Sequence, residues 1–359
     1  MMNVRTEIIA ILCISIIAGA FLGTLGKQKI KQEKIVVEQE VIEKKINSIT
    51  LSFVGDITPT KEFPDLFGFV KEELSKPDLM IGNLEGVITD KEKNKCGRII
   101  TNKCYAFSGN EGFVQILKNA SFDMVNVANN HSYDFGEEGF FDTLKNLSNY
   151  DIDSIGAKNT IVEKKINGIR ISFVGFSTGV LTNDLNKEDT VKNIVEKAKT
   201  NSDLVVVLFH GGAEGMGATH VLNTKEKYLG EERGNVQSFA KIAIDNGADV
   251  VVGSGPHVLR GMEWYKGKLI AYSLGNFAGY NTFSTEGILG DSGILTINIE
   301  NKNQIIDANF IPISINKSGI PIIDWANTSI SQINNLSIED FGDNGIMFDE
   351  LGKTTNKNI

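Results

Sequence analysis

This sequence has no excess of basic residues, and it contains few histidines and cysteines. Its net charge is −9, because 36 lysines and arginines face 45 acidic residues. Binding to a phosphate backbone needs clustered positive charge, so this balance predicts no nucleic-acid partner. The sequence also shows no repeat of fixed period, which argues against a solenoid or a propeller.

Cysteine occurs at only three positions. Cys96 and Cys104 stand at the two ends of the stretch CGRIITNKC, whose spacing is unlike that of a zinc knuckle. Outside the cytoplasm such a pair closes a small disulfide loop, whereas in the cytoplasm it stays as two free thiols. We therefore expect a disulfide between Cys96 and Cys104 in exported protein.

The sequence does contain a long uncharged run near its start. Residues 8–25 read IIAILCISIIAGAFLGTL, and roughly 17–25 apolar residues can span a bilayer. We expect residues 1–26 to be a membrane anchor, or a signal segment cleaved near Ala20. The domain would then face outside, or be secreted after cleavage. The four lysines between residues 27 and 34 favour the opposite orientation, because positive residues flanking a span usually stay in the cytoplasm.

From about residue 48, strand-like and helix-like segments alternate. Runs rich in valine, isoleucine and phenylalanine end in glycine, asparagine or aspartate, as buried strands do. Strands alternating with helices predict an α/β domain, and an Asn167-Gly168 turn predicts an antiparallel hairpin within it. We expect mixed sheets, with two sheets packed together. The expected strands are 49–55, 78–83, 123–129, 169–177, 203–212, 248–255 and 269–276, and the expected helices are 139–149, 192–199 and 235–247.

These patterns divide the chain into four parts. Residues 27–46 are charged and poor in aromatics, which indicates a linker between the apolar segment and the domain. The α/β domain is expected over residues 47–315. Residues 316–359 are polar and acidic, and we expect them to form a peripheral tail.

Polar side chains close several of the expected strands. Asp56 ends the first strand, Asn83 and Glu85 follow the second, and His210 and His257 follow two later ones. Because the carboxyl ends of parallel strands share one edge, we expect these groups to meet. A single strand-terminal Asp or Asn is more often a helix cap or an Asx turn. The combination of carboxylates, an amide and imidazoles at one edge instead favours a divalent metal site.

Another strand-like run, 123–129, is followed by Asn130 and His131, with Asp134 three residues further on. Burying such polar groups at a strand end is costly unless they have partners. Three of the four histidines of the chain therefore follow apolar strands at turns rich in glycine or asparagine.

Five motifs occur in a fixed order between residues 49 and 313: SFVGDITPT, IGNLEGVIT, NVANNHSYDFGEEGFFDTL, LFHGGAEG and GEERGNVQSFAKIAIDNGADVVVGSGPHVLRGMEWYKGKLIAYSLGNF. Together they resemble the capsule-synthesis CapA family, also called the poly-γ-glutamate biosynthesis (PgsA-like) family, of the calcineurin-like metallophosphoesterase superfamily. The resemblance implies a four-layered α/β/β/α sandwich with mixed sheets. It also implies one or two divalent ions (Mn, Mg, Fe or Zn) at the strand ends.

The resemblance assigns roles position by position. His131 would act as an acid or stabilise the transition state, and Asp134 would orient its imidazole. Glu85 is favoured over Asn83 as the bridging ligand, with Asn83 assisting. The implied metal ligands are Asp56, Asn83, Glu85, Asn130, His210 and His257.

Two positions depart from the superfamily pattern. Thr58 stands where the Asp-x-His motif has its histidine, and Gly255 replaces the first histidine of the His-x-His motif. The site is therefore richer in oxygen than a standard two-metal phosphatase. Such a site would hold one metal, prefer Mn or Mg to Zn, or bind without hydrolysing.

The function expected is that of a membrane-attached, outward-facing, metal-dependent hydrolase-like protein. It would serve the synthesis, anchoring or export of an extracellular polymer such as poly-γ-glutamate, with the anionic polymer or membrane proteins of a polymer synthase as partners. One alternative is a non-catalytic metal-binding subunit of the synthase or exporter, which the two missing ligands favour. The other is a secreted metallophosphodiesterase unrelated to capsule. Retention of His131 with Asp134 favours an enzyme.

Overall fold

The structure, a computed structural model, describes residues 48–355 except 63, 98–103 and 301–303, together with three lysines near the start of the chain. The chain divides by its internal contacts into Met1–Asn47 and Ser48–Ile359. The expected anchor or signal segment, residues 1–26, lies outside the described residues, as does nearly all of the expected linker. Within the described residues, no helix has the length and apolar character needed to cross a membrane.

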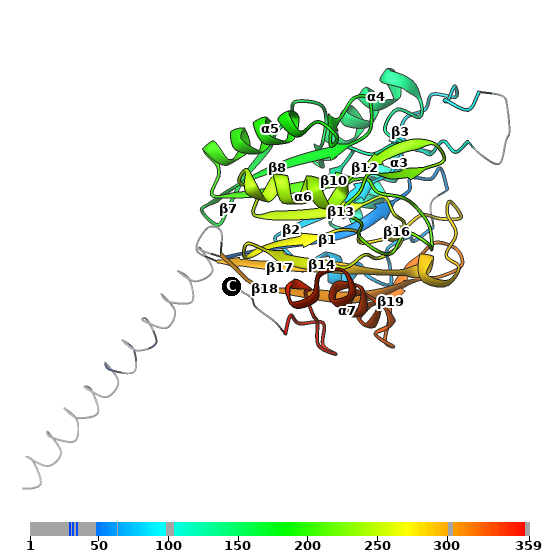
Figure 1. The fold of residues 1–359 in the computed structure, drawn as a ribbon. Coiled ribbons are helices and arrows are strands. Elements are labelled where there is room, and N and C mark those ends of the chain that lie inside the picture. Colours follow the sequence, from blue (N-terminus) through cyan, green and yellow to red (C-terminus); the bar gives the residue numbers. More distant parts are fainter. Residues whose placement is uncertain are drawn as a thin grey trace, which may run out of the picture. The chain divides into compact units, whose positions relative to one another are not determined.

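Two β-sheets form the framework of the second unit (Figure 1). The first sheet has the order β19 (Pro321–Ile323), β18 (Gln304–Ile315), β17 (Asp291–Glu300), β1 (Ser48–Ile57), β2 (Leu79–Leu84), β5 (Met124–Asn126) and β6 (Asp153–Ile155), with β16 (Asn276–Ala278) also paired to β1. The second sheet has the order β14 (Met262–Tyr265), β15 (Lys268–Ala271), β13 (Val250–Ser254), β10 (Leu204–His210), β8 (Ile169–Ser177) and β7 (Val162–Ile166), with β9 (Asn183–Asp184) paired to β8. Two smaller pairs are β3 (Val87–Ile88) with β4 (Ser108–Gly109), and β11 (Glu226–Tyr228) with β12 (Glu231–Gly234).

Both sheets mix parallel and antiparallel pairs, which confirms that part of the prediction. Strands β1, β2, β5 and β6 run parallel in the first sheet, as do β8, β10, β13 and β15 in the second. The pairs β7–β8, β14–β15 and β17–β18 are antiparallel hairpins. The predicted turn at Asn167-Gly168 is confirmed, because Ile166 pairs with Ile169 across it.

Helices cover the outer faces of the two sheets. Helices α3 (Glu111–Asn119) and α4 (Gly136–Ser148) bury their apolar residues in one cluster with the first sheet. Helices α5 (Glu188–Asn201) and α6 (Val236–Asp245) do the same on the second sheet, where Figure 1 shows them side by side. A third cluster, which includes Phe53 and Phe173, lies between the sheets. The order of layers is therefore helices, first sheet, second sheet, helices. The remaining short helices are α2 (Lys71–Leu74), η1 (Gly287–Gly290) and η2 (Gly342–Asn344).

The chain after Ile315 is part of this unit rather than a peripheral tail. Strand β19 pairs with β18, and helix α7 (Thr328–Phe341) buries Ile330, Ile333 and Leu336. The first two of these side chains join the cluster between the sheets. The structure therefore differs from the boundary expected after residue 315. The reason is that a single apolar stripe at helical spacing is enough to dock a helix whose other residues are polar.

One expected strand, 269–276, is divided between the two sheets. Its first residues lie in β15 of the second sheet, whereas Asn276 begins β16 and pairs with Asp56 of the first sheet. The crossing depends on a close approach of two backbones, because a Cβ on Gly55 would lie 1.9 Å from the carbonyl oxygen of Gly275. The N–H of Asp56 donates to that same oxygen at 2.9 Å. The contact brings a loop of the second sheet beside the end of β1.

Candidate metal centre

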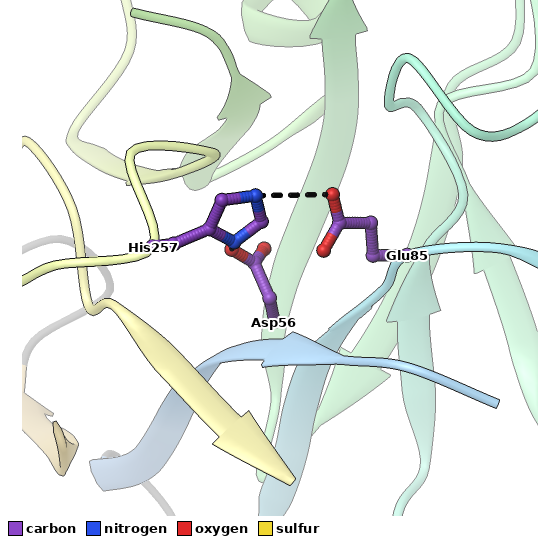
Figure 2. Close-up of side chains that lie close together, drawn as sticks. All are labelled: Asp56, Glu85 and His257. Atoms are coloured by element: carbon purple, nitrogen blue, oxygen red, sulfur yellow. Dashed lines mark ion pairs between the residues drawn. The ribbon is translucent and has the colours of Figure 1, made fainter. Parts of the chain in front are cut away.

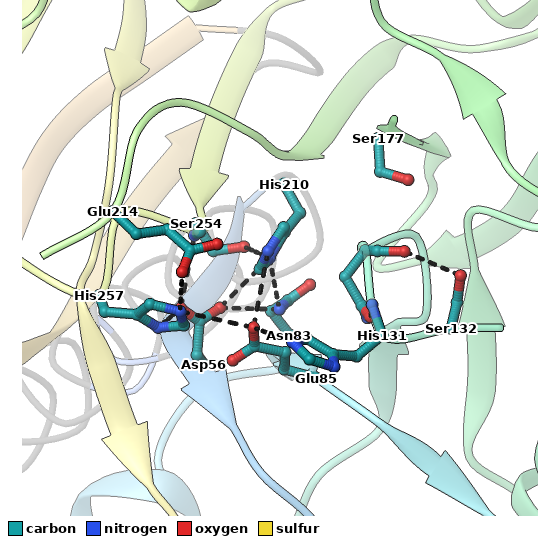
Figure 3. A network of polar contacts seen from close by, with 12 residues as sticks. Asp56, Asn83, Glu85, His131, Ser132, Ser177, His210, Glu214, Ser254 and His257 are labelled. Carbon is teal, nitrogen blue, oxygen red and sulfur yellow. Dashed lines mark hydrogen bonds and ion pairs between the residues drawn. The ribbon is translucent and has the colours of Figure 1, made fainter. Parts of the chain in front are cut away.

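Side chains from both sheets converge where the carboxyl ends of β1, β2, β10 and β13 meet (Figure 3). Asp56 and Glu85 come from the first sheet and are buried, and His210 closes β10 of the second sheet. His257 follows β13 with a left-handed backbone at φ 60°. The structure thus brings together four of the six ligands expected from the sequence.

Asp56, Glu85 and His257 form the tightest group (Figure 2). Their ligand atoms all lie within 4.8 Å of one another, which is close enough for the three residues to hold one metal ion. His257 bridges the two carboxylates, with Nδ1 3.2 Å from Asp56 Oδ2 and Nε2 3.6 Å from Glu85 Oε1.

The Oε1 atom of Glu85 is buried and has no hydrogen-bond partner among the described residues. Three imidazole nitrogens surround it instead. Its distances to their Nε2 atoms are 3.6 Å for His257, 3.7 Å for His210 and 3.8 Å for His131. These distances are too long for hydrogen bonds. Ligand atoms held about 2.1 Å from one ion lie roughly 3.0–3.5 Å apart, so the spacing is close to that of a metal ligand set.

This donor set fits a divalent cation. An orphaned buried carboxylate oxygen is costly, and a cation would satisfy it. Two carboxylates and one or two imidazoles are ligands that Mn, Fe and Zn share, whereas Mg prefers oxygen alone. The residues present therefore support a metal site.

Asn83 lies in the site, and both ends of its amide are hydrogen-bonded. Asn126 is anchored by the backbone of Ala128, because it donates to the carbonyl oxygen at 3.0 Å and accepts from the N–H at 3.3 Å. Its amide also donates to Asn83 Oδ1 at 2.8 Å, and Asn83 Nδ2 donates to Asp56 Oδ1 at 2.8 Å. Asn83 Oδ1 therefore accepts one hydrogen bond, and a ligand role for it stays a prediction. This residue also orients the Asp56 carboxylate.

His131 reaches the site from the turn after β5. Asn129 holds this turn, because its amide donates to the carbonyl oxygen of Leu84 at 2.7 Å and its Oδ1 accepts from the N–H of His131 at 2.9 Å. The imidazole Nδ1 lies 2.8 Å from Oδ2 of Asp134, whose carboxylate is fully buried. The pair expected from the sequence is therefore in contact, and Nε2 is the ring nitrogen that faces Glu85.

Asn130 lies between Asn129 and His131 in this turn. Its Oδ1 atom is buried and has no hydrogen-bond partner among the described residues, as with Glu85 Oε1. An orphaned amide oxygen suits a cation ligand.

The electric field of the site favours a carboxylate at Asp56 and a proton on His257. Burial alone would raise the pKa of Asp56, but hydrogen bonds and charge from His210 and His257 hold this pKa far below its usual range. Burial alone would lower the pKa of His257, but the charge of Glu85 and the contacts with the Asp56 and Glu214 carboxylates hold this pKa well above its usual range. A metal ion would replace that proton, since only neutral imidazole binds a metal.

Glu214 and Arg233 are site residues that the sequence analysis missed. Glu214 Oε2 lies 3.6 Å from Nε2 of His257, and its Oε1 lies 2.7 Å from Nη2 of Arg233. The buried Arg233 also places Nη2 3.4 Å from Nε2 of His210. Glu214 carried a usable signal, because it follows His210 by four residues in a glycine-rich turn. Arg233 carried none, since it stands in an ordinary charged stretch.

The two departures from the superfamily pattern have different surroundings. Gly255 has a left-handed φ of 111°, and a Cβ there would lie 2.9 Å from the backbone nitrogen of Gly211 and 3.1 Å from the ring of His210. No histidine fits at this position without movement of the backbone. Thr58 is buried in the lining of a pocket.

That pocket has a volume of about 410 Å³ and opens over the candidate metal site. Glu85, His131, Glu214 and His257 all line it. Four aromatic residues line it as well: Tyr105, Phe107, Tyr228 and Phe283. A substrate placed there would contact His131 and the candidate ligands together.

Comparison with known proteins gives consistent matches. Residues 50–281 match the family described as bacterial capsule synthesis protein PGA_cap. The chain is 31% identical over 259 residues to the capsule biosynthesis protein CapA of Bacillus anthracis, covering 64% of this chain and 59% of the relative. It is also 31% identical over 258 residues to the PGA biosynthesis protein CapA of Bacillus subtilis (strain 168), covering 64% of this chain and 63% of the relative. The chain therefore spans about three fifths of the length of these two relatives.

Among solved structures, a hypothetical protein from Thermus thermophilus aligns with a TM-score of 0.47 and 14% identity. The alignment covers 74% of this chain and 98% of that one.

Proposed function

This chain belongs to the bacterial capsule synthesis family PGA_cap, and we propose that it works in the synthesis, anchoring or export of an extracellular polymer such as poly-γ-glutamate. The names of its two Bacillus relatives support this role. The partners proposed are the anionic polymer itself and the membrane proteins of a polymer synthase.

The biochemical activity proposed is metal-dependent hydrolysis on a metallophosphoesterase-like fold. One observation carries it: the orphaned Oε1 of Glu85 lies among three imidazole Nε2 atoms in the lining of a pocket of about 410 Å³. The residues that would hold the metal are Asp56, Glu85, Asn130, His210 and His257. The oxygen-rich donor set makes Mn the ion we propose first, since it accepts carboxylate, amide and imidazole ligands.

When bound, the metal supplies Lewis acidity, which polarises an oxygen of the scissile group and makes a nearby water more acidic. The protein supplies the rest. Asp134 holds Nδ1 of His131, so Nε2 faces the pocket and can hold the proton that the leaving oxygen or nitrogen needs. Asn83 keeps Asp56 in place, and the Glu214 carboxylate lies beside His257. The bond cleaved would be a phosphoester, or an amide if the polymer is the substrate.

The second candidate is a non-catalytic subunit of a polymer synthase or exporter. The observation that favours it is the absence of two imidazoles, at Thr58 and Gly255, from the pattern that the superfamily resemblance implies. In that case the metal would hold polymer carboxylates or stabilise the fold. The third candidate, a secreted metallophosphodiesterase unrelated to capsule, shares the chemistry of the first and differs only in its substrate.

We propose that the protein is held at the outer face of the cell membrane by residues 8–25, or secreted after cleavage near Ala20. The uncharged character of that run supports this location. A disulfide between Cys96 and Cys104 supports it too, because disulfides persist in oxidising compartments.

The test combines metal analysis with turnover. The purified full chain is analysed for bound metals and then assayed with added Mn on bis(p-nitrophenyl) phosphate and on a γ-glutamyl amide. Metal-dependent hydrolysis of either compound supports the enzyme and identifies the bond. Bound metal without turnover of either compound favours the non-catalytic subunit.

A further inference from the structure

The two segments that flank the Cys96–Cys104 disulfide contact the His131–Asp134 pair. Cys96 and Cys104 are joined, with their Cα atoms 5.8 Å apart. The residue before the first cysteine, Lys95, and a residue shortly after the second, Phe107, both contact Asp134. The two flanks of the disulfide therefore meet at the carboxylate that orients His131.

Lys95 contacts Asp134 at two points. Its Nζ lies 2.7 Å from Oδ1 of Asp134, and its backbone N–H donates to the carbonyl oxygen of Asp134 at 2.7 Å. The Asp134 side chain is fully buried, whereas that of Lys95 is 39% exposed. A buried carboxylate is costly unless an opposite charge lies close to it. The partly exposed Lys95 supplies that positive charge.

Phe107 contacts both members of the pair. Its backbone N–H donates to Oδ2 of Asp134 at 2.8 Å, and this oxygen is the one that lies 2.8 Å from Nδ1 of His131. Its ring lies 4.6 Å from the His131 ring, centroid to centroid. Lys95 and Phe107 thus contact both oxygens of Asp134, and the Phe107 ring packs beside the imidazole.

We propose that Lys95 and Phe107 are positioning residues for His131, and that the Cys96–Cys104 disulfide holds them in place. The physical reason is that the disulfide shortens the connection between the two flanks, so that fewer arrangements of the flanks compete with the one in which Lys95 and Phe107 contact Asp134. The proposal deepens the function proposed above, because positioning matters for turnover only if His131 acts on a substrate. Its structural part does not depend on turnover.

The first test is a spectroscopic one and needs no substrate. The chain has four histidines, so the full chain labelled with ¹⁵N-histidine gives four sets of imidazole signals, and His131→Ala identifies the one of interest. Lys95→Met should move the His131 signals, and Lys95→Arg should keep them near wild type, because arginine restores the charge. The signals of His220, which is half exposed and pairs with Asp340, serve as the internal reference.

The matched control is Lys91→Met. Lys91 lies in the same stretch and pairs with the exposed Glu138 at 2.7 Å, so its loss should leave the His131 signals unchanged. The second variant is Cys96→Ser with Cys104→Ser, which removes the disulfide and keeps Lys95 and Phe107. It should also move the His131 signals and leave those of His220 in place.

Each outcome decides one part of the proposal. Unchanged His131 signals in Lys95→Met overturn the positioning role of Lys95, and unchanged signals in the double serine variant overturn the role of the disulfide. In turnover of bis(p-nitrophenyl) phosphate, Lys95→Met should lower kcat about tenfold with little change in KM, the usual size of an effect on an orienting partner. If the wild type shows no turnover, the proposed activity fails while the spectra still decide the positioning.

Discussion

Glu85 Oε1 and His257 Nε2 lie 3.6 Å apart, the first following a strand of the first sheet and the second following a strand of the second. The two atoms form no hydrogen bond with each other, because their separation exceeds the length of a hydrogen bond. Glu85 Oε1 has no other hydrogen-bond partner among the described residues. A cation shared by the two atoms would join the edges of both sheets. The metal would then contribute to stability as well as to chemistry.

We expect the purified full chain to carry at least one divalent metal after growth with Mn or Zn. His210→Ala combined with His257→Ala should abolish binding, since it removes both imidazole ligands. Elemental analysis measures the metal directly. His220→Ala is the matched control, because His220 is exposed and pairs with Asp340 outside the site. Wild-type protein that contains no metal under these conditions would rule out the site.

His131→Ala should separate chemistry from metal binding. The imidazole faces the pocket, and Asn130 rather than His131 is the expected ligand of this turn, so metal content and melting temperature should stay near wild type. The hydrolytic rate should fall by roughly 10²–10⁴-fold, the usual contribution of a positioned general acid. Asp134→Asn should give a smaller loss, because it only weakens the orientation of the ring. Asn130→Ala should lose metal and rate together.

The same variant distinguishes the enzyme from the non-catalytic subunit. In cells that depend on this protein for polymer production, His131→Ala should lower the yield of polymer if the protein is an enzyme. A normal yield with intact metal would contradict the catalytic role of His131, and would favour the subunit.

The cysteine pair gives a separate prediction. Cys96 and Cys104 should resist alkylation in native exported protein and react after reduction, which peptide mass spectrometry can measure. Replacing both by serine should lower the free energy of unfolding by roughly 2–3 kcal/mol, as expected for a loop this short. Rapid alkylation of both thiols without a reductant would show that the bridge is absent.

Helix α7 should be required for stability. Ile333→Ala should destabilise the protein by roughly 2–5 kcal/mol, because its side chain is fully buried in the cluster between the sheets. Ile338→Ala on the same helix is the control, since Ile338 is 51% exposed and its loss should change stability by less than about 0.5 kcal/mol. Equal denaturant midpoints for the two variants would contradict the placement of α7 in the core.

Much of the framework follows from local pattern. The run 169–177 predicts β8 with its observed ends, and Asn167-Gly168 predicts the turn before it. Such features are local, because strand propensity, burial and turn chemistry act over a few neighbouring residues. Helix α7 escaped prediction because its apolar stripe is narrow. Its docking also depends on contacts with β18, a separate segment that the pattern of the helix itself does not reveal.

The sequence by itself determined which residue types stand at the strand ends, and therefore that carboxylates, amides and imidazoles would meet there. Only the tertiary structure decided which contacts, and so which role, each of these side chains has. Asn83 turns its oxygen to Asn126 and its nitrogen to Asp56, while one oxygen of Glu85 has no hydrogen bond within the part of the chain that the structure describes. Lys95 contacts Asp134 from the segment just before the disulfide. Each of these outcomes depends on contacts between segments distant in sequence, and no local pattern specifies which of several nearby polar groups will satisfy a given atom.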